Sequence, residues 1–181
     1  MSLRNLTLLL VLLWSAACGS AGTSPLGTET RVLRPGAGES IRLDTQSSAR
    51  NHTLPTPVAD AWDALWAAYR SLEIPITGQD PDTHMIENDG FRARRIEGRR
   101  MSEFFMCGQG VTGSVADTYQ VTLYVHTSLE VEGASMTTLY TQVDATAEAR
   151  DTRSGTLHCE SRGRLEELIA ERVTSFLPTV P

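Results

Sequence analysis

Five arginines lie within the nine residues RARRIEGRR at positions 92–100. Guanidinium groups bind phosphate and carboxylate through paired hydrogen bonds, so the segment could hold anionic lipid headgroups or an acidic partner surface. In the alternative interpretation, the segment is a solvated strand whose arginines pair with carboxylates of the same domain. Alternation along a strand would separate Arg92 and Arg94 from Arg95, and this split favours the alternative. The candidate anion- or partner-binding residues are Arg92, Arg94, Arg95, Arg99 and Arg100.

The other chemistry-bearing residues form no recognisable catalytic pattern. The run Gly108–Gly113 (GQGVTG) has the glycine spacing of a dinucleotide fingerprint. That fingerprint requires a parallel strand before it and a helix after it, whereas an alternating strand pattern follows here, so we expect a loop. The four histidines have no metal-ligand spacing, and Ser114 lies outside any nucleophile-elbow motif. The sequence therefore predicts no catalytic residue, no metal and no cofactor.

The first twenty residues have the pattern of an export signal. Arg4 supplies a positive charge, Leu6–Trp14 is an apolar run, and small residues then lead to Cys18. About nine apolar residues are too few to span a bilayer core of roughly 30 Å as a helix, which indicates a cleaved leader. The stretch Ser15–Cys18 (SAAC) resembles the lipobox of bacterial lipoproteins. This resemblance implies cleavage before Cys18 and a lipid anchor on its thiol; an ordinary signal peptide with a chance cysteine is the alternative.

The resemblance implies three parts of the chain: a signal peptide over residues 1–17, a lipidated tether over 18–30, and a single domain over 31–181. The tether is small, polar and turn-forming, with a root-mean-square reach of roughly 20 Å. By analogy with other lipoproteins, Gly19 in place of Asp favours the periplasmic face of the outer membrane. The net charge is −6, and the loss of Arg4 makes it more negative, so we expect no nucleic-acid partner.

The three cysteines agree with export. If Cys18 is acylated, Cys107 and Cys159 remain as an even pair in an oxidising compartment, which favours a disulfide between them. Such a bond closes a loop of about 53 residues and contributes on the order of 4 kcal/mol to stability. Two free buried thiols, or a metal site that includes His158, are the alternatives.

Two segments have the periodicity of amphipathic helices. We expect the first to begin at an N-cap Thr56, with Pro57 in the first helical position, and to stop before Pro75. The second covers residues 162–177 and is capped by Ser161. The apolar positions of the first helix are Val58, Trp62, Leu65, Tyr69 and Leu72, and those of the second are Leu165, Leu168, Ile169, Val173 and Phe176.

Strand patterns fill most of the rest. Residues 118–127 and 137–147 alternate strictly and flank Gly133, so they should pair antiparallel. Residues 83–96 should form a hairpin that turns at Asn88-Asp89-Gly90. Shorter strands are expected within residues 31–44 and 50–54. The fold class predicted is a two-layer, helix-grip-like α+β domain, with both helices on one face of an antiparallel sheet.

This element order, together with the stretch 74–90 (IPITGQDPDTHMIENDG), resembles the helix-grip domains of BamC-like lipoproteins over residues 50–177. The resemblance implies a non-enzymatic scaffold or binding module of outer-membrane assembly with an envelope protein partner; an uncharacterised lipoprotein family of the same fold fits equally well.

Two alternatives belong to other function classes. A small envelope hydrolase could use His84 or His126 as its base. A protein that binds a small apolar ligand could line a cavity between helix and sheet with Trp62, Trp66 and Tyr69, although these side chains at helical spacing are typical of core.

Overall fold

The computed structural model describes residues 30–33, 41–44, 49–149 and 155–178. The predicted signal peptide, the acylated Cys18 and the tether up to residue 29 lie outside the described residues. At the start of the described chain, β1 (Thr30–Leu33) and β2 (Ile41–Asp44) form a two-stranded antiparallel sheet, in agreement with the strands predicted there.

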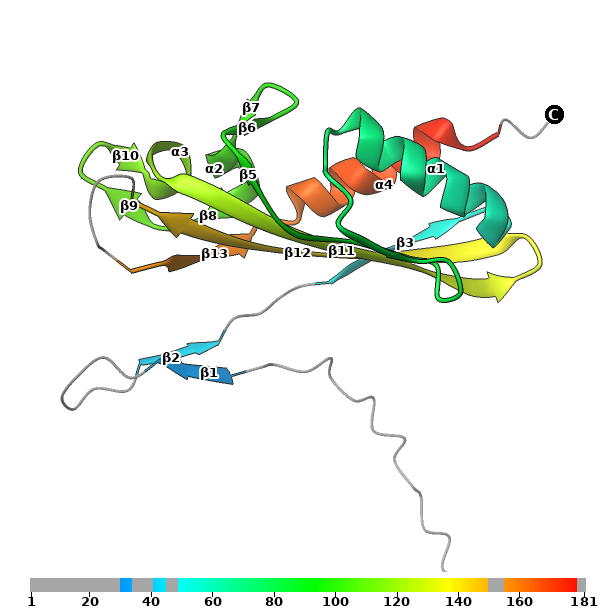
Figure 1. The fold of residues 1–181 in the computed structure, drawn as a ribbon, viewed down its shortest axis with the longest axis horizontal. Coiled ribbons are helices and arrows are strands. Elements are labelled where there is room, and N and C mark those ends of the chain that lie inside the picture. Colours follow the sequence, from blue (N-terminus) through cyan, green and yellow to red (C-terminus); the bar gives the residue numbers. More distant parts are fainter. Residues whose placement is uncertain (1–29, 34–40, 45–48, 150–154, 179–181) are drawn as a thin grey trace, which may run out of the picture.

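A seven-stranded sheet with two helices on one face forms the body of the protein (Figure 1). All of its strand pairs are antiparallel. The helices are α1 (Val58–Ser71) and α4 (Arg164–Phe176). The predicted two-layer α+β fold is confirmed. The strands, in sheet order, are β4 (Gly78–Asp80), β5 (Met85–Ala93), β11 (Gln120–Gly133), β12 (Met136–Glu148), β13 (Leu157–Ser161) and β8 (Phe105–Met106), with β3 (Arg50–Leu54) also paired to β12.

The β11–β12 hairpin is the longest element of the sheet and confirms the predicted antiparallel pair. Gly133 and Met136 face each other across a two-residue turn. Alternate side chains are buried because they face the helices, and the intervening ones lie on the uncovered face. The buried set includes Val121, Leu123, Val125, Leu139, Thr141, Val143, Ala145 and Ala147.

Helix α1 packs against both α4 and the sheet. Its buried positions include small residues at Ala61, Ala64 and Ala68, which allow the two helices to approach closely. Tyr69 is fully buried, and its hydroxyl forms a 2.7 Å hydrogen bond with Oγ1 of Thr127 on β11. Burial raises the pKa of Tyr69 far above its ordinary value, so the phenol remains neutral. Tyr69 is therefore a core residue, as its helical spacing predicted.

The hairpin predicted around Asn88-Asp89-Gly90 is wrong. These residues lie within the continuous strand β5, where the pairing with β11 shifts by one residue and leaves a bulge. Asn88 is buried and donates from Nδ2 to the carbonyl of Pro75 at 2.7 Å, while its Oδ1 accepts the Gly90 amide. Gly90 has φ of +133°, which only glycine adopts readily. These turn-forming residues therefore form a β-bulge within one strand and do not reverse the chain.

The predicted helix caps are also wrong in detail. Pro57 is the N-cap of α1, and Thr56 is buried, with its carbonyl accepting a hydrogen bond from Thr137. The N-cap of α4 is Gly163, in left-handed conformation, and not Ser161. The Ser161 hydroxyl accepts a hydrogen bond from the Gly163 amide, which lies before the helix. Helix α1 ends before Pro75 is reached, because left-handed Glu73 reverses the chain.

Candidate anion-binding site

The arginine-rich segment forms a small hairpin that follows β5 and lies on the side of the sheet that carries the helices (Figure 1). Strand β6 (Arg95–Ile96) pairs with β7 (Arg99–Arg100), and Arg95 lies opposite Arg100. Glu97 and Gly98 form the two-residue turn, with φ of 48° and 75°, as a type I′ turn requires. The guanidinium of Arg95 donates to the Gly98 carbonyl at 2.7 Å and closes the turn. The hairpin thus has a defined shape.

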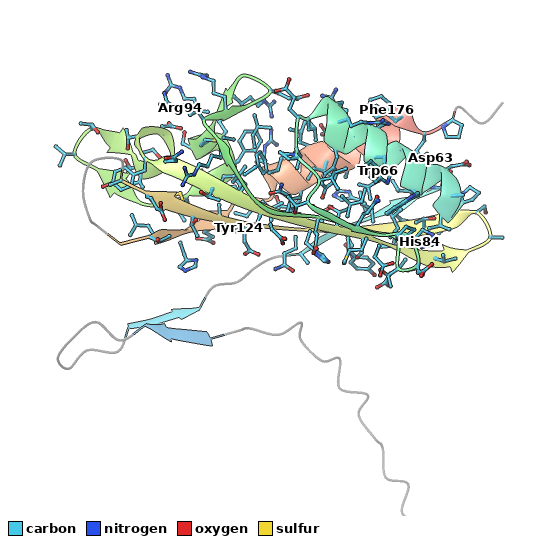
Figure 2. The ribbon with its side chains drawn as sticks, in the orientation of Figure 1. Asp63, Trp66, His84, Arg94, Tyr124 and Phe176 are labelled. Atoms are coloured by element: carbon cyan, nitrogen blue, oxygen red, sulfur yellow. A yellow bond between two sulfur atoms is a disulfide. The ribbon has the colours of Figure 1, made fainter. Side chains whose placement is uncertain are left out.

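The side chains of this hairpin divide between the core and solvent. Ile96 is 4% exposed and fixes the hairpin to the core, whereas the arginines on either side of it are exposed. Arg92 lies opposite Thr122 at the end of β5. Arg94 follows β5 and points outward from the domain (Figure 2). The hairpin therefore presents several guanidinium groups to solvent from one short segment.

None of the five arginines lies within 4.0 Å of a carboxylate oxygen of any residue that the structure describes. The segment is solvated, as the alternative interpretation expected, but the structure shows none of its arginines paired with a carboxylate over the described residues. The only acidic residue of the segment, Glu97, pairs with Arg172 of α4. Glu97 is thus paired with a helix residue, and no ion pair to any of the five arginines occurs among the described residues.

Two short helices, α2 (Met101–Phe104) and α3 (Val115–Thr118), follow the hairpin in the chain, and α2 packs against both β7 and α3. Helix α2 follows β7 directly, and Glu103 accepts the Arg100 amide at 3.2 Å. Asp117 of α3 accepts hydrogen bonds from both the amide and the hydroxyl of Ser102, at 2.9 and 2.7 Å. Met101 and Phe104 are buried beneath these contacts. The position of the arginines is thus set by core packing and by a network of local hydrogen bonds.

The glycine-rich run forms a second small hairpin, β9 (Gln109–Gly110) and β10 (Gly113–Ser114). It is an exposed turn, as predicted, and no nucleotide-binding helix of useful length follows it. Cys107 and Cys159 lie at its base at disulfide distance, with their Cα atoms 4.2 Å apart. These are the two cysteines for which the sequence predicts a disulfide.

The histidines do not assemble a catalytic site in the described part of the chain. His126 lies on the uncovered face of β11, with Nδ1 3.7 Å from Oε2 of Glu87. No hydrogen bond joins His84 or His126 to a Ser, Thr or Cys side chain among the described residues. The ring of His84 packs edge-on against Trp62, with centroids 5.8 Å apart. Nor does any group of three possible metal ligands occur among the described residues.

Glu166 is the one fully buried carboxyl group among the described residues. Ser161 donates a 2.7 Å hydrogen bond to its Oε1, while Oε2 has no partner in the described residues. Burial raises the pKa of Glu166, against the opposing effects of Ser161 and Arg50. These contacts join β13 to the first turn of α4, so we assign this carboxyl a structural role.

An open pocket of about 330 Å³ lies between α1 and the chain that leaves α4. Its lining combines two carboxylates with alanine, phenylalanine and proline side chains, and none of the residues proposed for an apolar-ligand cavity takes part. Figure 2 places Asp63 and Phe176 at the opposite end of the domain from Arg94. The lining residues are Asp60, Asp63, Ala64, Ala67, Phe176 and Pro178.

No model of a known protein family matches the sequence, and no curated protein is significantly similar to it. No helix among the described residues is long and apolar enough to cross a bilayer.

Proposed function

We propose that the protein is a lipid-anchored, non-catalytic binding domain of the cell envelope, which holds anionic groups with its arginine-rich hairpin. The lipobox at residues 15–18 supplies the anchor, and the ligand carries phosphate or carboxylate groups. In an envelope scaffold, for example one that serves outer-membrane assembly, an acidic partner surface would provide such groups.

The observation that carries this proposal is that five exposed arginines have no carboxylate partner within 4.0 Å among the residues that the structure describes. A domain with net charge −6 has many acidic side chains that could neutralise its cations, as several pairs elsewhere show. Exposed arginine forks without carboxylate partners can make bidentate bonds to an anionic ligand, although Arg95 also donates to the Gly98 carbonyl. A fixed hairpin also lowers the entropy that these side chains lose on binding.

Reversing two charges of the hairpin should abolish most ligand capture. In the variant R99E/R100E, we expect the membrane-extracted lipoprotein to retain envelope components at least roughly tenfold less well, because each arginine near an anionic surface contributes about 1 kcal/mol. The measurement is pull-down of envelope proteins, cell-wall material and anionic lipid, followed by quantification of each. Thermal unfolding checks that the fold is unchanged.

The matched control is R70E/R164E, which makes the same change of charge at exposed positions on α1 and α4. We expect capture close to that of the unmodified protein, because these side chains lie outside the hairpin. Equal capture by R99E/R100E and the unmodified protein would refute the assignment of the site.

A further inference from the structure

A large apolar side chain with no cover lies at the tip of the β9–β10 hairpin. Val111 occupies the two-residue turn with Thr112 and is fully exposed, at 107% of its reference area. Apolar side chains usually avoid such a position, because a turn tip has no neighbouring core to cover it. Met106, at 50% exposure, lies just before the same hairpin. Among the exposed large apolar side chains of the described residues, Val111 therefore has the highest exposure, and it lies at the tip of a hairpin.

The strand register places this tip and the arginine hairpin at the same end of the sheet. Arg92 lies opposite Thr122, and Thr122 lies opposite Thr146, whose other neighbour is His158. His158 adjoins Cys159, which is bonded to the residue at the base of the β9–β10 hairpin. Both hairpins are therefore connected to strands at this end of the sheet, with α2 and α3 between them (Figure 1). We call this part, residues 92–119, the disulfide end.

The opposite end of the domain carries acidic side chains. Glu130 and Glu132 are exposed beside the β11–β12 turn. Helix α1 begins close to that turn, because Leu54 at the end of β3 pairs with Thr137, and its first two turns carry Asp60 and Asp63. The disulfide end, residues 92–119, has five arginines against the three carboxylates of Glu97, Glu103 and Asp117, whereas the residues named at the far end are all acidic. Near a negatively charged surface, such an asymmetry turns the basic end toward that surface.

We infer that the disulfide end docks on an anionic phospholipid bilayer, with the arginines on headgroup phosphates and Val111 inserted among the lipids. This inference rests on the proposed function and names the ligand. Arginines bind the phosphate layer, and an apolar side chain at the tip of the other hairpin can reach the adjacent hydrocarbon; both features recur in protein segments that lie at membrane interfaces.

The test places a fluorescent reporter at the tip in the variant V111W. The full protein, as the cell processes it, is reconstituted into vesicles of phosphatidylglycerol and phosphatidylethanolamine with brominated acyl chains, which quench nearby tryptophan. We expect the added fluorescence to be quenched and blue-shifted in these vesicles, but not in vesicles of phosphatidylcholine alone. The unmodified protein provides the background of its native tryptophans. Adding R99E/R100E should remove the quenching, since each arginine strengthens docking roughly fivefold.

The control is V131W, at an exposed apolar position beside the acidic β11–β12 turn, 60% exposed in the structure. We expect no quenching there, because this end faces away from the bilayer. Quenching of V131W equal to that of V111W, or no quenching of V111W, would overturn the docking. If R99E/R100E still loses capture of an acidic protein in that case, the anion-binding proposal stands and only its membrane ligand falls.

Discussion

Replacement of both Cys107 and Cys159 with alanine is expected to lower the free energy of unfolding by about 4 kcal/mol. The two residues are 52 positions apart, so in the chain-entropy model their bond removes a large part of the freedom of the unfolded chain. Net stabilities of domains are roughly 5–15 kcal/mol, which makes this a large fraction of the total. In a domain of this size the melting temperature should fall by roughly 8–16 °C.

Urea and thermal unfolding of the oxidised protein and of C107A/C159A measure the effect. Reductant should destabilise the unmodified protein to nearly the same extent and should leave the double variant unchanged. A loss also follows in the binding assays, because the bond fixes the base of the β9–β10 hairpin to β13. An unmodified protein whose unfolding is insensitive to reductant would show that the cysteines are not bonded in solution.

Replacement of Phe104 with alanine should cost about 3–5 kcal/mol, since it deletes a fully buried aromatic ring and leaves a cavity. Phe104 ends α2, and its carbonyl accepts the Arg162 amide at 2.8 Å, so the residue fixes the disulfide end to the chain that leads into α4. We expect the arginine hairpin to lose its fixed position together with this packing. Urea unfolding gives the loss of stability, and hydrogen exchange locates it.

The matched control is Met106→Ala, two residues further along the same segment. Its side chain is half exposed, so the change should stay within roughly 0.5 kcal/mol. Similar destabilisation by both variants would contradict the account, because it would mean that Met106 packs in the core as Phe104 does.

Strict alternation allowed the main strands to be predicted, because one face of the sheet is covered and the other is not. On β12 every second residue from Thr137 to Ala147 is buried, and the sequence shows this directly. Asn88-Asp89-Gly90 misled the prediction, because Asn, Asp and Gly stabilise a bulge through the same conformations that favour a turn. The partner that decides between them, the Pro75 carbonyl, is 13 residues away.

The candidate site was predictable in composition but not in geometry. The run of arginines is visible in the sequence. The turn at Glu97-Gly98 was missed, because the predicted hairpin ended at Ile96. Whether the arginines are paired depends on contacts far along the chain. Arg172, 75 residues away, takes the nearby carboxylate of Glu97, and no local pattern indicates this. The exposure of Val111 likewise follows from tertiary packing that leaves the tip uncovered.

The proposed lipid anchor at Cys18 decides whether the domain works beside a membrane at all. Mass spectrometry of the protein isolated from the envelope fraction tests it directly, by identifying the first residue and its modification. The proposed function predicts that the chain begins at Cys18, with a thioether-linked diacylglyceryl group on the sulfur. An intact leader with an unmodified Cys18 thiol, on protein recovered from the soluble fraction of the cell, would contradict it.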